Sequence, residues 1–309
     1  MSATIPTRVL AYDAQAIAEA AAAILRGQPV AVPTETVYGL AADATDARAV
    51  AAIYAAKGRP SFNPLIVHVA DGAAARRIAV LDAEAERLAA AHWPGPLTMV
   101  LPRGDGSPVA ALATAGLATV AVRVPEHRAM RALLAAVGRP LAAPSANASG
   151  AISPTRAAHV VASLGGRIAL VIDDGATGAG IESTIVDPAA RTILRPGPVT
   201  AELLPAYVRH DGAGVTAPGQ LASHYAPDKP LRLDATERRA GEWLIGFGAV
   251  AGDDTLSAGG DVVEAAARLF DCLHRADASG AVGIAVVPVP AVGLGEAIND
   301  RLTRAAAPR

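Results

Sequence analysis

The chain has 309 residues, a hydrophobic fraction of 52% and a formal net charge of −2 at pH 7. This length allows two domains and a sizeable core. The near-neutral charge argues against a general coat for nucleic acid, because nonspecific binding to nucleic acid depends on excess positive charge.

Three further features narrow the class of protein. The longest uncharged stretch, 278–295, contains two prolines and four glycines, which makes it a poor membrane-spanning helix. The first residues, MSATIPTRVLAYDAQ, have no basic segment followed by an apolar block and predict no signal peptide. Cys272 is the only cysteine, which excludes a disulfide framework and a thiolate metal cluster. We therefore expect a soluble, cytoplasmic protein.

Helical and strand patterns alternate from the start of the chain. Asp13 predicts the start of a helix and Gly27 its end, and Asp46 and Gly58 delimit a second helix in the same way. Pro154 predicts the first turn of a later helix. The predicted helices of this part cover residues 13–27, 46–58, 82–93, 126–138 and 154–166.

Short apolar runs between these helices predict strands. They cover residues 29–33, 65–70, 97–103, 118–125, 140–146, 168–175, 183–187 and 192–197. This order predicts an α/β sheet with helices packed on it, and some successive strands are close enough in sequence to be antiparallel.

The composition changes after Val208. Residues 209–230 are rich in glycine, proline and small polar residues and predict a linker, although they include Gln220, His224 and Tyr225. The remaining chain reads as strand, strand, helix, strand, helix, which predicts a small second α/β domain of roughly 80 residues. We therefore expect a first domain over 1–208, a linker over 209–230 and a second domain over 231–309.

The first polar stretch, PTETVYGL at 33–40, directly follows a predicted strand. Thr34, Glu35 and Thr36 are three consecutive polar residues, more than a turn without a function would need. Element ends are where α/β folds place their sites. A helix-capping loop is the alternative interpretation.

The second stretch is KGRPSFNPLIVHV at 57–69. Lys57 and Arg59 flank a glycine and suit a phosphate, although the sequence is not the glycine-rich phosphate loop. Lys57 is one of two lysines among 27 basic residues, which favours a site that needs a compact ammonium. The alternative is ordinary positive charge at a helix carboxyl end. His68 is equally compatible with a half-buried hydrogen-bonding histidine, and Asn63 with the start of a turn.

Two more stretches are polar at element ends. PSANASG at 144–150 has the small hydroxyl and amide residues that leave backbone N–H groups accessible to an anion, or it is a plain Ser/Asn-rich loop. In 180–200, Glu182 and Ser183 introduce a strand and Arg195 precedes a Pro-Gly pair, which also fits a simple hairpin. The sequence has no H-x-x-x-H pair and no G-x-S-x-G elbow, so we expect neither a histidine metal cluster nor a serine hydrolase.

Six segments taken together resemble one family. In chain order they are PTETVYGLAADA, KGRPSFNPLIVHV, WPGPLTMVL, VAVRVPEH, PLAAPSANASGAISPT and ESTIVD…ILRPGPV, and they are spread over residues 33–199. They resemble the YrdC-like family of threonylcarbamoyl-AMP synthases, with the paired signatures Lys57-x-Arg59 and Ser145-x-Asn147. PGQLASHYAP and GLGEAINDRLTRAA are similar to the linker and the carboxyl end of its long, two-domain form. The resemblance implies a twisted open sheet with flanking helices, plus a small carboxyl-terminal Rossmann-like domain.

The same resemblance implies a nucleotidyltransferase. The family combines L-threonine, bicarbonate and ATP into L-threonylcarbamoyladenylate and pyrophosphate, the first step of threonylcarbamoyladenosine modification of tRNA. Such an enzyme works by positioning and by offsetting negative charge. The resemblance implies Mg²⁺ carried by the ATP phosphates, no metal-binding side chain and no organic cofactor. It implies a downstream tRNA threonylcarbamoyl transferase machinery as partner, with no membrane and no need of tRNA for this step.

The resemblance also assigns roles to individual residues. The catalytic residues are Lys57 and Arg59. The ATP-binding residues are Lys57, Arg59, Asn63, Thr119, Ser145, Asn147, Ser153, Arg195 and Tyr225, the last as a lid. The L-threonine-binding residues are Thr36, His68, Arg123, Ala143 through its backbone, and Ser183.

Two other functions remain as alternatives. One is an RNA-binding module without catalysis. The near-neutral charge and an aromatic content of only 3% argue against it, because proteins that bind single strands stack bases on aromatic side chains. The other is a carbamoyl transferase that uses carbamoyl phosphate.

Overall fold

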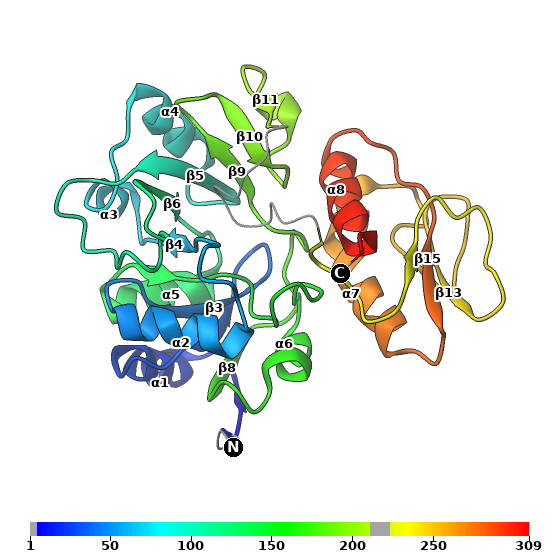
Figure 1. Ribbon diagram of the computed structural model, residues 1–309, viewed down its shortest axis with the longest axis horizontal. Helices are drawn as coiled ribbons and strands as arrows, with labels where there is room; N and C mark the ends of the chain where they lie inside the picture. Colours follow the sequence, from blue (N-terminus) through cyan, green and yellow to red (C-terminus); the bar gives the residue numbers. More distant parts are fainter. Residues whose placement is uncertain (1–4, 211–222, 309) are drawn as a thin grey trace.

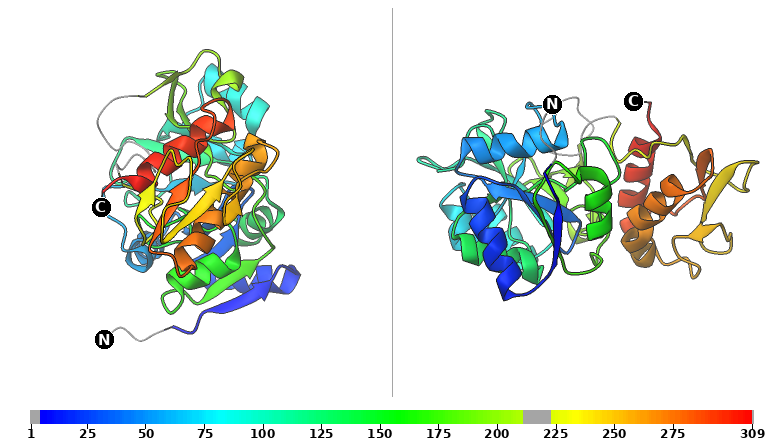
Figure 2. Two further views of the ribbon diagram at one scale, coloured as in Figure 1. Left: turned by 90° about the vertical axis from the view of Figure 1, so that its right-hand side faces the viewer. Right: turned by 90° about the horizontal axis from the view of Figure 1, so that it is seen from below.

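The computed structural model describes residues 5–210 and 223–308 (Figure 1). The centre of the predicted linker, 211–222 with Gln220, lies outside the described residues. Two bodies of secondary structure lie side by side in Figure 1 and in the right-hand view of Figure 2. The larger one contains the amino-terminal strand and the smaller one the carboxyl-terminal helix.

The larger body contains one mixed eleven-stranded sheet. Its strands are β1 (Arg8–Ala11), β2 (Val30–Pro33), β3 (Tyr38–Asp43), β4 (Ile66–His68), β5 (Leu97–Pro102), β6 (Thr119–Arg123), β7 (Leu141–Ala142), β8 (Leu170–Asp173), β9 (Thr184–Asp187), β10 (Thr192–Arg195) and β11 (Val208–Arg209). Their spatial order is β1-β8-β2-β3-β7-β4-β6-β5-β9-β10-β11. Parallel and antiparallel neighbours both occur, as the sequence predicts.

The helices of this body are α1 (Ala14–Leu25), α2 (Ala47–Lys57), α3 (Gly72–Arg76), α4 (Ala83–His92), α5 (Arg128–Val137), α6 (Ala157–Leu164) and the 3₁₀ turn η1 (Ala201–Leu203). Side-chain caps mark the start of every helix of this body except α6 and η1. The Asp13 side chain accepts from the Ala16 N–H and that of Asp46 from the Arg48 N–H, which satisfies donors that have no partner inside the helix. Gly58 ends α2 in the left-handed conformation. The helix starts predicted from these aspartates are confirmed.

The structure corrects three expectations. Pro154 does not lie in the first turn of α6, because that helix is capped by Arg156 and begins at Ala157. Residues 34–37 are a turn between β2 and β3, so the helix-capping alternative is wrong. His68 is almost fully buried rather than half-buried.

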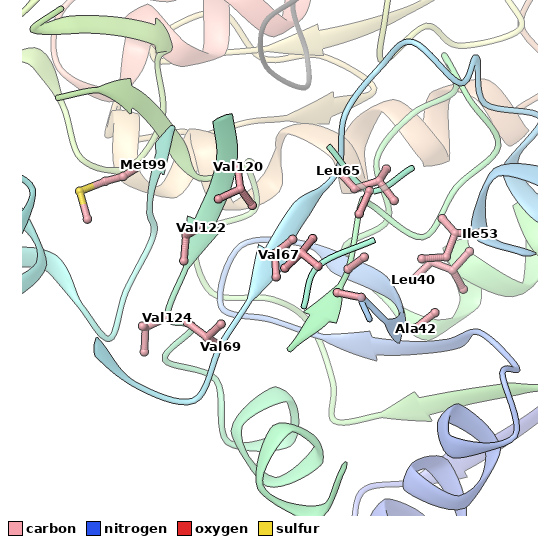
Figure 3. Packing of buried hydrophobic residues seen from close by; sticks show 14 of the residues in the cluster. Leu40, Ala42, Ile53, Leu65, Val67, Val69, Met99, Val120, Val122 and Val124 are labelled. Atoms are coloured by element: carbon pink, nitrogen blue, oxygen red, sulfur yellow. The ribbon is translucent and has the colours of Figure 1, made fainter. Parts of the chain in front are cut away.

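Alternation along the central strands separates a core face from a polar face. Val67 of β4 and Val122 of β6 point into the main core, where Figure 3 shows them beside Leu65, Val69 and Val120. Because successive side chains of a strand point to opposite faces, His68 and Arg123 emerge on the other side of the sheet. These two residues are also direct partners in the parallel β4–β6 pair. The register therefore places their side chains next to each other.

The smaller body has a four-stranded parallel sheet. Its strands are β12 (Leu231–Arg232), β13 (Glu242–Gly246), β14 (Asp254–Thr255) and β15 (Gly283–Val286), in the order β12-β15-β13-β14. Its helices are α7 (Val262–Ala278) and α8 (Leu294–Ala306). Both helices lie between this sheet and the larger body (Figure 1). The helix–sheet packing therefore presents helical surface to the first body.

A shared apolar cluster joins the two bodies. Val37, Ile152 and Ile181 of the larger body pack in one cluster with Tyr225 and Phe270. The chain after the undescribed segment also bonds directly to the larger body, since the Ala226 N–H donates to the Gly150 carbonyl at 2.8 Å. The interface is therefore packed like a core.

Among the described residues, no helix is long and apolar enough to cross a membrane.

Substitution of Gly180 can test the packing between the two bodies. Gly180 has a φ of +70°, and an added Cβ would lie 2.4 Å from the Ala267 Cα and 2.5 Å from the Ala266 carbonyl oxygen, both in α7. We expect Gly180→Ala to lower the free energy of unfolding by about 1–3 kcal/mol beyond its backbone strain, because α7 has to move. Urea denaturation measures this difference.

Gly175→Ala is the matched control. Gly175 has a similar φ of +80°, but no described atom lies within 4 Å of the added Cβ. It should therefore show only the strain of a left-handed alanine, about 1 kcal/mol. Equal destabilisation by the two substitutions would contradict the close contact between Gly180 and α7.

Candidate active site

A cavity lies on the polar face of the large sheet, against the start of the second body. Its volume is only about 50 Å³. That is room for a few water molecules but not for a nucleotide. It is lined by Thr34, Thr36, Val37, Gly39, Arg59, Ile66, His68, Arg123, Ala143, Pro144, Ser145, Glu182, Ser183, Arg195, His224 and Tyr225.

Arg123 is held from the β2–β3 turn. Its guanidinium lies 2.6 Å from the Glu35 carboxylate and donates to the Thr36 hydroxyl at 2.9 Å. Thr34 shapes the turn, because its hydroxyl donates to the Val37 carbonyl. Burial raises the pKa of Glu35, but the charge and hydrogen bond of Arg123 outweigh burial and hold that pKa below its ordinary value. The pair is therefore ionised and, taken together, electrically neutral.

His68 is neutral. Burial and the neighbouring charge of Arg123 lower its pKa to about 3. Neither ring nitrogen has a hydrogen-bond partner among the described residues. An imidazole with so low a pKa is a poor general base near neutral pH, because efficient proton transfer needs a pKa near the working pH. It is available to hydrogen-bond to a ligand.

Lys57 secures the loop that carries the serine and asparagine signature. Its side chain is buried, and its ammonium donates to the backbone carbonyls of Ser145 and Asn147 at 2.5 Å each. The Lys57 carbonyl accepts in turn from the Ser149 N–H. Burial and then the charge of Arg59 lower the Lys57 pKa well below its ordinary value. The end of α2 and the loop at 145–149 therefore form one unit.

Arg59 is held by neutral oxygens. Its guanidinium donates to the Asn63 side-chain oxygen at 2.6 Å and to the Pro64 carbonyl at 2.9 Å. Burial lowers its pKa to about 10, so the group still carries its charge at neutral pH. None of these hydrogen-bond acceptors carries a negative charge. The positive charge of Arg59 therefore remains available at the cavity.

Ser183 and Arg195 close another side of the cavity. The Ser183 hydroxyl lies 2.8 Å from that of Thr98, and Arg195 donates to both the carbonyl and the hydroxyl of Ser183 at 3.1 Å. Glu182, the preceding residue, accepts a hydrogen bond from the Ser153 hydroxyl. The segment before β9 is therefore tied both to the sheet and to the region around Ser153.

Tyr225 and His224 reach the cavity from the second body. Tyr225 is fully buried at a φ of 62°, a left-handed conformation unusual for tyrosine. Its ring lies 5.6 Å from that of Phe270 in α7. The His224 N–H donates to the Arg304 carbonyl in α8. The segment is thus anchored on both helices of the second body.

The structure brings most of the predicted residues to this cavity. Those that line it are Thr36, Arg59, His68, Arg123, Ala143, Ser145, Ser183, Arg195 and Tyr225. Lys57, Asn63, Asn147 and Ser153 lie behind these residues and contact lining residues or their loops. Thr119 is at the start of β6, four residues before Arg123 on the same face, or about 13 Å along the strand.

Several lining residues were not assigned a role from the sequence. Glu182 and Thr34 belong to motifs that the sequence singles out, so their polarity was the available signal. His224 stood out only as a polar residue in a linker. Val37, Gly39, Ile66 and Pro144 line the cavity with backbone and apolar atoms, for which the sequence carries no signal.

The cavity has the chemistry of an anion-binding site without a nucleophile. Arg59, Arg123 and Arg195 converge on it, and it contains no activated serine or cysteine. Among residues 5–210 and 223–308 there is no group of three histidine, cysteine or carboxylate side chains that could hold a metal. The arrangement can position anionic substrates and stabilise negative charge that develops between them.

Comparisons with known proteins point in one direction. Residues 22–197 match the Sua5_yciO_yrdC family model, described as "Telomere recombination", and residues 197–307 match the Sua5_C model, described as "Threonylcarbamoyl-AMP synthase, C-terminal domain". The chain is 40% identical to a threonylcarbamoyl-AMP synthase of Bacillus subtilis, over 95% of this chain and 93% of the relative. It is 39% identical to the Pyrococcus abyssi protein of the same name, over 93% and 92%. The crystal structure of P. abyssi Sua5 complexed with L-threonine superposes with a TM-score of 0.88 and 37% identity, over 97% of this chain and 98% of that one.

Buried neutral histidines predict that the protein loses stability in mild acid. Burial lowers the pKa of His68, His224 and His274 to about 3, whereas an unfolded histidine titrates near 6.5. As pH falls below about 6.5, the unfolded chain binds protons that the folded chain does not. The free energy of unfolding should therefore fall by up to about 1.4 kcal/mol per pH unit for each such histidine, and no such loss occurs above that pH. Urea denaturation at about pH 7.5, 6.5 and 5.5 measures it.

Substitution identifies the source of the loss. His274→Gln should flatten the decline, because one proton fewer is taken up on unfolding. His210→Gln, at an exposed position, is the matched control. A stability that is the same at all three pH values would show that these histidines are protonated in the folded protein.

Proposed function

The chain belongs to the threonylcarbamoyl-AMP synthase family, and on this premise we propose how its cavity makes L-threonylcarbamoyl-AMP from L-threonine, bicarbonate and ATP. The observation that carries the proposal is the convergence of three buried arginines, Arg59, Arg123 and Arg195, on one cavity. The product is the activated precursor of threonylcarbamoyladenosine in tRNA, and a tRNA-modifying transferase is the partner that consumes it.

The reaction needs positioning more than covalent help. The threonine amine captures the carbon of bicarbonate to give a carbamate, with loss of water. A carbamate oxygen then attacks the α-phosphorus of ATP, and pyrophosphate leaves. Holding the reactants in line and stabilising negative charge are the contributions expected of the protein.

Threonine fits the Arg123 side of the cavity. Free threonine carries a carboxylate, and Arg123 lines the cavity while Glu35, which does not line it, holds the guanidinium at 2.6 Å. Arg123 would bind the substrate carboxylate, as guanidinium groups do. His68, Thr36, Ser183 and the Ala143 backbone would complete the pocket around the side chain.

ATP fits the Arg59 side of the cavity. Arg59 keeps its charge because its partners are neutral oxygens, and the loop at 145–149 offers small polar residues next to it. Ser145, Asn147, Ser153, Asn63 and Thr119 would contact the nucleotide, with Arg195 on the far side. Mg²⁺ would arrive on the ATP phosphates as part of the substrate, because Glu35 and Glu182 are already paired with arginines.

Tyr225 would act as a lid. Tyr225 and His224 line the cavity of about 50 Å³ from the side of the second body, so a movement of Tyr225 would make room for ATP. Closing over bound substrates would keep water from the labile adenylate. The anchoring of Tyr225 on α7 makes the second body the support of this lid.

Product analysis tests the function. Purified protein mixed with ATP, L-threonine and bicarbonate should release pyrophosphate and form a product of the mass of threonylcarbamoyl-AMP. Carbamoyl phosphate in place of bicarbonate and threonine should give no product. Turnover with carbamoyl phosphate would favour a carbamoyl transferase, and salt-dependent RNA binding with no ATP turnover would favour an RNA-binding module.

Removal of the two signature cations should reduce the rate. Arg59→Ala and Lys57→Met should each lower kcat/KM for pyrophosphate release by about a hundredfold, or about 2–3 kcal/mol of transition-state stabilisation. Arg59 would lose its phosphate contact, and Lys57 the anchor of the loop at 145–149. Steady-state pyrophosphate release is the measurement.

Lys229→Met is the matched control. The Lys229 ammonium also donates to backbone carbonyls, those of Ala276, Asp277 and Ser279, but within the second body. It should leave kcat/KM within a few-fold of the parent value. Lys57→Met with parental kinetics would refute the role given to this lysine.

A further inference from the structure

Arg301 of α8 is a buried arginine that reaches the cavity wall from the second body. Its side chain is 0% exposed. Its guanidinium donates to the Glu182 carboxylate at 2.9 Å and to that of Asp300 at 2.9 Å. Its central carbon lies 5.3 Å from the centre of the Tyr225 ring, within cation–π range. Arg301 does not itself line the cavity, so any effect on substrates passes through Glu182 and Tyr225.

Glu182 is an unusual residue for an anion site. It lines the cavity together with Arg59 and Arg195. Burial raises its pKa, but the charges of Arg301 and Arg195 outweigh burial and hold the pKa below its ordinary value. An ionised carboxylate there repels the phosphates of ATP unless a cation compensates it. Arg301 is the cation in hydrogen-bonding contact with it.

We propose that Arg301 is a positioning residue of the synthase: it neutralises Glu182 at the ATP site and holds Tyr225 over the cavity. The helix α8 thereby supports the catalytic site from outside the domain that contains the signature motifs (Figure 1). The effect of Arg301 on the reaction rate rests on the proposed function. Its effect on ATP binding can be measured without turnover.

The contact also explains why Glu182 is placed where it is. Its other oxygen accepts from Ser153, whose backbone carbonyl lies 3.1 Å from the His274 ring of α7. One carboxylate therefore joins the loop before β9, the residues that precede α6, and both helices of the second body. Loss of Arg301 leaves that carboxylate charged and buried, which is more damaging than loss of the whole pair.

The experiment compares Arg301→Gln, Glu182→Gln and the double variant. ATP binding is measured by calorimetry on the full chain, and pyrophosphate release by steady-state kinetics. Arg301→Gln should weaken ATP binding and raise KM for ATP by at least about tenfold, with a smaller change in kcat, because uncompensated charge acts on binding. Adding Glu182→Gln should restore most of the ATP affinity, since it removes the repelling charge.

If Arg301 had only a structural role, adding Glu182→Gln would not restore the ATP affinity. Two damaged contacts would weaken the protein further, so a double variant no better than Arg301→Gln would overturn the proposal. Arg268→Gln in α7 is the matched control, because Arg268 pairs with Asp254 and Glu264 within the second body only. If Arg301→Gln does not fold, Arg301→Lys keeps the charge and loses the shape of the contact. It should retain ATP affinity within a few-fold of the parent, and a tenfold loss would contradict neutralisation by charge.

The two proposals fail in different ways. A parent protein that binds ATP but forms no threonylcarbamoyl-AMP refutes the proposed function and leaves the affinity test of Arg301 intact. A parent that turns over, with unchanged ATP affinity in Arg301→Gln, refutes the role of Arg301 alone. A parent that does not bind ATP refutes both.

Discussion

The burial of positive charge is the constraint on which this structure depends. An isolated buried cation costs several kcal/mol, so each one has to find a partner that is also held in place. Five buried cations surround the cavity: Lys57, Arg59, Arg123, Arg195 and Arg301. Lys57, Arg123 and Arg301 are held by residues 88, 87 and 119 positions away in the chain, whereas Arg59 is held by its own loop, at Asn63 and Pro64. The pairing of these charges therefore fixes which segments meet at the cavity.

The nature of each partner determines what charge the cavity keeps. Lys57 and Arg59 are paired with neutral oxygens, so their side of the cavity stays positive, as triphosphate binding requires. Arg123 is paired with Glu35, which does not itself line the cavity, so the net charge on this side is near zero while the guanidinium still faces the cavity. Two substrates of different charge can therefore be sorted by electrostatics within one small space.

The sequence predicted local features well and long-range ones poorly. Asp13 and Asp46 cap their own helices two or three residues away, so their effect is visible in the sequence. The strand β3 was missed because its sequence, YGLAAD, contains a glycine, two alanines and an aspartate but no β-branched residue, so its local strand propensity is weak. The rarity of lysine pointed to Lys57, but its carbonyl partners lie 88 and 90 residues further along the chain. Nothing local marks Arg301, since Glu182 is 119 residues away and the contact exists only after both bodies pack.

The second body is coupled to the first through the substrates. Arg301 compensates Glu182 only when α8 is packed against the loop before β9, and Tyr225 lies over the cavity only in the same arrangement. If this packing favours ATP binding, bound ATP must favour the packing by the same free energy, because linkage is reciprocal. On the proposed function, separation of the bodies would have two simultaneous effects: it would move Tyr225 away from the cavity, and it would leave Glu182 with the charge of Arg195 but without that of Arg301. Substrate binding and domain closure are therefore one equilibrium, and the charge of Glu182 sets the strength of their coupling.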